Sequence, residues 1–255
     1  MPEPKTEGKG MKNPTRKTCK IAGALALALT LAMNLTAPAG NNGSGAPRIA
    51  PPNSMAFGKS LAQWLSIYWR WNYSGADLAN SVVDGVQLMP LPAGDQISGS
   101  WTPQDPALLR GKLEITLPAG TPFVLPEFAW VGERYPGWPA VNDDPPIANT
   151  VALASASPTL TIDGKVVISA ANKAAFYIPP TYFDPIVTYE SPSASGAVAA
   201  VFFQGIGFVS PPLSVGVHVI HLYEPLIIPA GAYSGLPDGI GIIYDNTWII
   251  TVTPN

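Results

Sequence analysis

The spacing of apolar residues predicts one helix in the first third of the chain, within "FGKSLAQWLSIYWRW" at 57–71. Apolar residues recur there three and four positions apart, which places them on one stripe of a helix. The stripe consists of Phe57, Leu61, Trp64, Leu65, Tyr68 and Trp71. Trp69 lies off it and is expected to be the most exposed ring. Gly75 is a typical stop, so we expect a helix over 57–73, packed on the rest of the protein through this stripe.

From Ser81 onward, short apolar runs broken by Pro and Gly replace the helical period, and no other helix is expected. In "LEITL" (113–117), apolar and polar residues alternate, which is the period of a half-buried strand. Asp163-Gly164, between "LT" and "VVI", is typical of a two-residue hairpin turn. The predicted fold class is mainly β: an antiparallel β-sandwich or jelly-roll-like fold with one N-terminal amphipathic aromatic helix.

Residues 1–39 have the pattern of a secretory signal peptide. The basic "MKNPTRKTCK" precedes the apolar "IAGALALALTLAMNL", and "APA" at 37–39 is a typical cleavage site. Met11 is a possible true start, because the first ten residues are unusual ahead of such a signal. The Gly/Pro/Asn-rich segment 40–53 is expected to be a flexible arm, and residues 54–255 a single β domain.

Composition after cleavage narrows the function classes. Cys19, the only cysteine, leaves with the signal peptide, so the mature chain has no disulfide and no thiol nucleophile. Six of the 14 basic and two of the 17 acidic residues also leave, and the remaining 8 basic and 15 acidic residues give a net charge of about −7. This balance argues against binding nucleic acid or anionic membranes, and no membrane insertion is expected after cleavage.

The segment 127–147, "EFAWVGERYPGWPAVNDDPPI", is expected to be a long irregular loop and the best place for a site. Aromatic rings stack on sugar faces and planar polar side chains hydrogen-bond to sugar hydroxyls, so the aromatic and polar residues of this segment favour a carbohydrate-binding site. The candidate ligand-binding residues are Trp130, Arg134, Tyr135, Trp138 and Asn142. The candidate catalytic carboxylates are Glu127, Glu133, Asp143 and Asp144, of which Asp143 and Asp144 are also candidate calcium ligands. A Pro-braced loop without any ligand remains an alternative.

The two histidines, His218 and His221, are the only ones in the chain. In a regular strand they face opposite sides, so they cannot converge on one metal ion unless a bulge intervenes. A structural role, or a role for one of them alone, is expected. We predict no cofactor, apart from a possible calcium ion.

Five stretches in order resemble a family of uncharacterised secreted bacterial β proteins that open with a Trp-rich helix. They are the helix at 57–71, "PAGTPFVLP" (118–126), "IDGKVV" (162–167), "PLSVGVHVI" (212–220) and "NTWIITVTP" (246–254). The resemblance covers most of the chain after the signal peptide. It implies export and a β domain, but this family has no established activity, so no catalytic residue follows from it. The family's cysteines are missing here.

Three functions therefore remain open. The first is a secreted, extracellular or periplasmic binding or surface-associated module, with an extracellular glycan or other surface polymer as its partner. The second is a hydrolase of an extracellular polymer that uses the carboxylates of 127–147. The third is a self-assembling surface subunit, in which the arm at 40–53 pairs with a neighbour's sheet edge.

Overall fold

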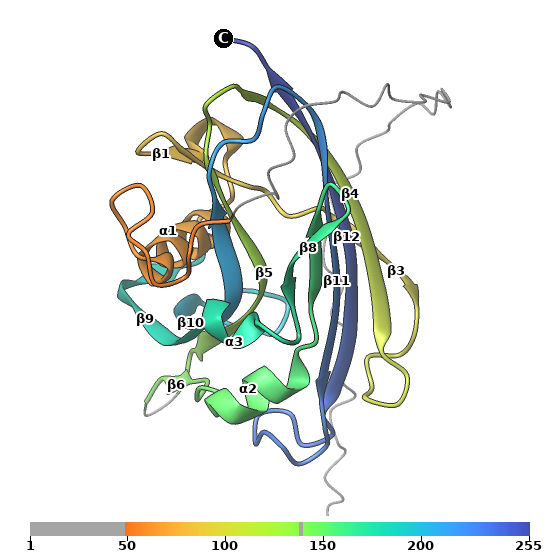
Figure 1. Cartoon of the computed structure of the whole chain (residues 1–255). Coiled ribbons are helices and arrows are strands. Elements are labelled where there is room, and N and C mark those ends of the chain that lie inside the picture. The colour runs from red at the N-terminus through yellow and green to blue at the C-terminus, as the bar shows by residue number, and fades with distance from the viewer. Residues whose placement is uncertain (1–48, 138–139) are drawn as a thin grey trace, which may run out of the picture.

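The computed structural model describes residues 49–137 and 140–255. The predicted signal peptide, most of the predicted arm and Trp138 lie outside the described residues. The described chain forms three layers, with one long helix on the outer face of a first β-sheet and a second β-sheet behind the first (Figure 1). The expectation of a mainly β, sandwich-like fold with an N-terminal helix is confirmed.

The first sheet has the strand order β1-β2-β5-β10-β9, with β6 paired to β5. Its strands are β1 (Val82–Val83), β2 (Val86–Leu88), β5 (Phe123–Tyr135), β6 (Asn142–Asp143), β9 (Tyr177–Thr188) and β10 (Ala199–Ser210). The second sheet has the order β3-β4-β12-β11-β7-β8. Its strands are β3 (Gly94–Ser98), β4 (Ala107–Pro118), β7 (Thr159–Ile162), β8 (Lys165–Ser169), β11 (Gly216–Ile228) and β12 (Ile240–Thr253). Most pairings are antiparallel, as expected, but β2–β5 and β4–β12 are parallel.

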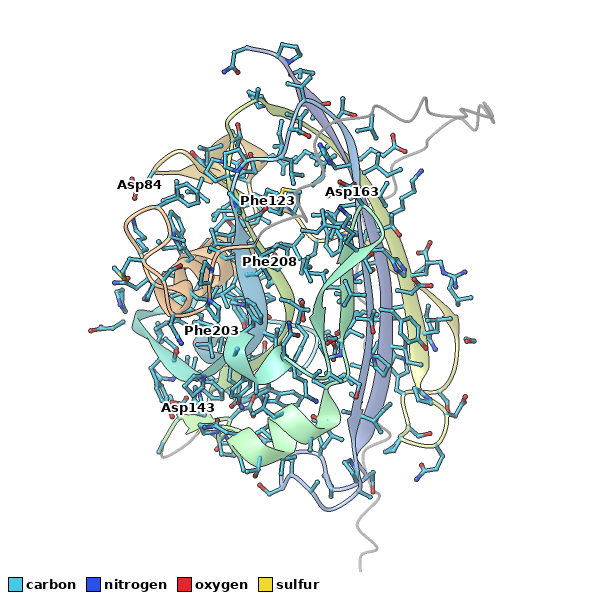
Figure 2. The ribbon with its side chains drawn as sticks, in the orientation of Figure 1. Asp84, Phe123, Asp143, Asp163, Phe203 and Phe208 are labelled. Atoms are coloured by element: carbon cyan, nitrogen blue, oxygen red, sulfur yellow. The ribbon has the colours of Figure 1, made fainter. Side chains whose placement is uncertain are left out.

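The first sheet is central because both of its faces are covered. Every residue of β10 is buried, which explains its nearly unbroken apolar run "AAVFFQGIGFVS". Helix α1 (Leu61–Tyr73) packs on β9 and β10 from one side, and the second sheet covers the other. Phe123 and Phe208 form an edge-to-face pair, 6.1 Å between ring centroids, in the middle of the molecule (Figure 2). Gly207 lets α1 approach closely, since a Cβ there would lie 2.7 Å from Leu65 Cδ2.

Helix α1 begins four residues later than predicted. Phe57 and Gly58 have positive φ and cannot continue a helix, and Ser60 with Gln63 forms a capping box that sets the first turn. The predicted stripe is buried from Leu61 to Tyr68. The predicted exposure of Trp69 is wrong: its ring is buried, and α1 packs against β9 as well as against β10.

Three local predictions have clear outcomes. Asp163 and Gly164 both have positive φ and join β7 to β8, so the predicted hairpin turn is confirmed. Two short helices that we did not expect are α2 (Asn149–Ser155), at the lower end of the molecule in Figure 1, and α3 (Lys173–Phe176), whose Lys173 donates to the Leu153 carbonyl of α2. A 3₁₀ turn, η1 (Leu78–Asn80), follows α1. None of the described helices is long and apolar enough to cross a membrane.

Candidate functional site

The segment expected to be a loop is largely a strand. Residues 127–135 belong to β5, which pairs with β10 along its whole length, and only the stretch beyond Tyr135 is irregular apart from β6. Glu127 is the extra residue of a β-bulge, because Pro126 and Phe128 pair with the adjacent residues Gly207 and Ile206. The side chains of β5 alternate between the two faces of the sheet, so the candidate residues separate into smaller groups and do not form one cluster.

Trp130 does not form part of an exposed stacking platform. Its ring is half-buried and meets Tyr233 edge to face at 5.4 Å, within a small apolar cluster that also contains Ile147 and Ala152. The Tyr233 hydroxyl donates to the Pro145 carbonyl at 2.6 Å. This cluster joins α2 to the two sheets, so the indole of Trp130 is better explained by packing than by ligand contact.

Arg134, Asn142, Asp143 and Asp144 form a surface hairpin. The Arg134 guanidinium bonds both oxygens of Asp143, at 2.7 and 2.8 Å, and holds the pKa of that carboxyl below its usual range. Asp144 accepts from the Glu133 N–H at 3.0 Å, and Asn142 is exposed opposite Tyr135. Figure 2 shows Asp143 at the α2 end of the molecule, far from Asp163. Within the described residues, no three or more His, Cys, Asp or Glu side chains gather as metal ligands, so calcium at Asp143 and Asp144 stays a prediction.

Glu133, one of the four candidate carboxylates, lines a pocket. The pocket measures about 380 Å³ and lies where the end of α1, β5 and the segment after β9 meet. Its lining residues are Asn72, Tyr73, Gly75, Glu133, Tyr189, Glu190, Ser191 and Ser193. Its volume lies in the range of small-molecule sites, which run from roughly 300 to 1,000 Å³.

Three hydroxyls hold the Glu133 carboxylate in this pocket. The Tyr189 hydroxyl donates to Oε1 at 2.9 Å, and the hydroxyls of Tyr135 and Ser195 donate to Oε2 at 3.2 and 3.3 Å. The first distance is normal for an O–H donor, whereas the other two are long. Oε2 accepts two donors and Oε1 accepts one, and a carboxylate has lone pairs for about four donors, two on each oxygen, so Oε1 keeps a free acceptor position among the described contacts. Glu133 can therefore accept a further donor from a ligand.

Two tyrosine rings form the apolar wall of the pocket. Tyr73, at the last turn of α1, stacks on Tyr189 with 5.7 Å between centroids and 23° between planes. Burial, followed by the nearby Glu133 charge, raises the pKa of both phenols well above the usual value. Both hydroxyls therefore keep their protons in neutral solution, and that of Tyr189 donates to the carboxylate.

A larger groove of about 720 Å³ lies elsewhere, between the N-terminal segment and the edge strand β8. It is lined by Ile49, Ala50, Pro51, Ser54, Ala56, Phe57, Val166, Val167 and Pro211. None of these side chains is charged and only Ser54 is polar, so the groove lacks the converging polar groups that orient a ligand. The smaller pocket around Glu133 is therefore the better candidate site.

Glu127 lies inside the protein instead of at its surface. Only 5% of the residue is exposed, and neither carboxylate oxygen has a hydrogen-bond partner. Burial, and then the charge of Glu224 on β11 of the opposite sheet, raises its pKa well above the usual range. Glu224 is fully buried, and burial raises its pKa to about 8. Its Oε1 accepts from the Ser157 N–H at 3.1 Å, whereas its Oε2 has no hydrogen-bond partner among the described residues. A solvent-accessible catalytic role for Glu127 is therefore not supported.

The histidines sit on opposite faces of β11, as the alternation predicts. His218 contacts Asp163 of the β7–β8 turn, with Nδ1 2.7 Å from Oδ2, and the same aspartate accepts from the Val219 N–H. His221 contacts Asp245 on the outer face of the second sheet at 2.8 Å. Each histidine has its own carboxylate partner, so the two do not converge.

Sequence reasoning missed most of the pocket. The stretch "YESPSASG" at 189–196 looks like an ordinary turn-rich loop, yet it supplies Tyr189, Glu190, Ser191 and Ser193. Tyr73 lies at the C-terminal end of a helix whose other rings are structural. The only available signal was the clustering of Tyr, Glu and Ser just after an extended segment. That pattern is too common to mark a site without the fold.

Comparison with the models of known protein families and with curated proteins finds no match. The resemblance to the secreted Trp-rich family therefore stays a prediction.

Proposed function

We propose that this protein is a secreted or periplasmic binding module, and that the Glu133 pocket holds a hydroxyl-rich ligand, a carbohydrate unit of an extracellular polymer. One observation carries the proposal. A carboxylate, several hydroxyls and a stacked tyrosine pair converge on one pocket from three separate elements. Sugars have hydroxyls that need planar acceptors and C–H faces that pack on rings, and both partners are present there.

The chemistry of the lining supports binding more than turnover. The four carboxylates proposed for catalysis do not come together: Glu127 is buried, while Asp143 and Asp144 belong to the surface hairpin. Glycoside hydrolysis needs two carboxyl groups at a set separation across the scissile bond. Glu133 and Glu190 both line the pocket, but a shared lining does not place them on either side of a scissile bond, so we favour the binding module.

The arm at 40–53 is partly engaged within its own chain. Ala50 donates from its backbone N–H to the Val209 carbonyl at 2.8 Å, at the end of β10 that β9 does not pair. Ile49 and Ala50 also pack on the main core. The described end of the arm is thus tied to its own sheet, which gives no support to pairing with a neighbouring molecule.

The test is a polysaccharide pull-down followed by titration of the bound polymer's oligosaccharides. Tyr189→Ala removes both the stacked ring and the donor to Glu133, and we expect it to abolish retention while the protein stays folded by circular dichroism. Tyr182→Ala is the matched control, because Tyr182 is an exposed tyrosine within β9, packed on Phe202 and outside the pocket lining. Retention of every polymer by Tyr189→Ala, or equal loss in Tyr182→Ala, would refute the assignment of the site.

A further inference from the structure

All charged side chains that line the pocket around Glu133 are negative. Glu133 and Glu190 both contribute to the wall, and no lysine or arginine is among the described residues that line it. The remaining lining residues are neutral: Asn72, Tyr73, Gly75, Tyr189, Ser191 and Ser193. Two like charges in one small concave site produce a field that favours a cation, since a cleft focuses the potential of its walls.

Helix α1 adds to this field. Asn72 and Tyr73 belong to the last turn of this 13-residue helix, and Gly75 follows its C-cap residue Ser74. The C-terminal end of a helix carries roughly half a negative charge on its free carbonyls, and this attracts cations within the last turn. The helix end and the two carboxylates therefore act in the same direction.

The basic residues closest in sequence are engaged elsewhere. Arg70, one turn before Tyr73, donates to the Pro185 carbonyl at 2.7 Å and lies over the Phe183 ring at 5.3 Å. Arg134 follows Glu133 on the strand but pairs with Asp143. Neither guanidinium is in the pocket lining, so neither neutralises Glu133 or Glu190 there.

We propose that the pocket selects a sugar unit carrying an ammonium group, as in a deacetylated amino-sugar polymer, over neutral or acidic sugars. The ammonium would donate to Glu133 Oε1, which accepts only the Tyr189 hydroxyl among the described residues, and Glu190 would supply the second charge in the pocket wall. The tyrosine pair and the hydroxyls would hold the ring. This inference rests on the proposed carbohydrate function and names its ligand class.

The test compares three soluble trisaccharides by calorimetry at about pH 6, where an aliphatic amine is protonated. They are the glucosamine trimer, the N-acetylglucosamine trimer and the galacturonic acid trimer. We expect the glucosamine trimer to bind most tightly, and its affinity to fall as salt screens the charges. Glu133→Gln and Glu190→Gln should each weaken it by roughly five- to tenfold, as expected for losing one partly screened charge contact.

The protein's overall negative charge requires a matched control. Glu114→Gln removes one charge from β4 in the second sheet, outside the pocket, where Glu114 pairs with Lys112 at 2.8 Å. This variant should bind the glucosamine trimer like the parent protein. An equal loss of affinity in Glu114→Gln would overturn the inference, because it would show attraction by the net charge alone.

The outcomes separate this inference from the proposed function. Equal or tighter binding of the acetylated or acidic trimer, lost in Tyr189→Ala, would overturn the charge preference and leave the carbohydrate pocket standing. Failure of all three trimers, together with failure of every polymer in the pull-down, would remove the proposed function itself. Tight binding of the glucosamine trimer that is lost in Glu133→Gln and Glu190→Gln would support both.

Discussion

Replacing Glu224 by glutamine should make this protein more stable in mildly alkaline solution. Glu224 is fully buried on β11, its charge helps to raise the pKa of Glu127 on the other sheet, and its Oε2 has no hydrogen-bond partner among the described residues. Burial raises the pKa of Glu224 most strongly, while the Ser157 N–H and then the Lys173 ammonium lower it. Tyr244 pairs with Glu224 on β12, and burial raises the pKa of its phenol as well. Folding therefore favours the protonated acid.

The pH window follows from the direction of the shift. The folded pKa of Glu224, about 8, lies above its ordinary value of 4.5, so the folded state binds the proton more tightly than the unfolded state. The contribution of Glu224 to the free energy of unfolding is then fully present below the ordinary pKa and is lost as pH rises through the folded pKa. The free energy of unfolding falls by about 1.4 kcal/mol for each pH unit between the ordinary and the folded pKa, which amounts to about 5 kcal/mol.

Glutamine removes the ionisation but leaves a buried amide. Its oxygen can keep the bond from the Ser157 N–H, whereas its NH₂ replaces Oε2, which has no partner, and costs about 1–3 kcal/mol. We therefore expect Glu224→Gln to be slightly destabilising near pH 5 and stabilising by about 2–4 kcal/mol near pH 8.

The assay is urea unfolding at a series of pH values from about 5 to 9, with the free energy of unfolding extrapolated at each pH. Glu127→Gln should act in the same direction, and the double variant should show the flattest pH profile. The exposed Glu114→Gln is the control and should keep the parent profile. A parent protein that is as stable at pH 8 as at pH 5, or a Glu224→Gln variant that gains nothing at pH 8, would refute the reasoning.

Two further stability predictions follow. Trp64→Ala should lower the free energy of unfolding by about 3–5 kcal/mol, because the ring is fully buried and its N–H donates to the Ala56 carbonyl at 2.7 Å. Chemical denaturation measures this loss, and Leu78→Ala, at an exposed position, is the control that should be nearly neutral. Gly205→Ala should destabilise more than Gly94→Ala, because its Cβ would lie 2.2 Å from the Phe128 carbonyl oxygen, whereas the nearest atom to a Cβ at Gly94 is at 3.6 Å. Similar melting temperatures for the two glycine variants would contradict this.

Local patterns predicted the elements well where few residues decide the conformation. The three- and four-residue spacing in "LAQWLSIYWRW" indicates a helix with one apolar stripe, and the stripe from Leu61 to Tyr68 is indeed buried. Asp163-Gly164 indicates a turn because both residues tolerate positive φ, which they adopt. Both signals reflect backbone preferences that act over a few neighbouring residues.

Prediction failed where a residue's surroundings come from distant strands. Trp69 was expected to be exposed because it lies off the apolar stripe, but α1 packs against both β9 and β10 and the ring is buried. The segment 127–147 was expected to be a loop because its sequence shows no obvious strand pattern, yet residues 127–135 belong to β5. In the fold, the bulge at Glu127 and the hydroxyls around Glu133 accommodate these two polar residues within β5.

The sequence is sufficient to predict a mainly β domain, one aromatic helix and a tight hairpin, since these depend on short-range periodicity and turn chemistry. It also predicts an acidic, cysteine-free mature chain, because composition does not depend on folding. The pocket depends on the tertiary structure. Glu133 and Tyr189 are 56 positions apart and meet because β5, β10 and β9 are neighbours in one sheet. Tyr73 joins them because α1 packs across that sheet, and strand order and helix docking are set by long-range burial that local patterns do not encode.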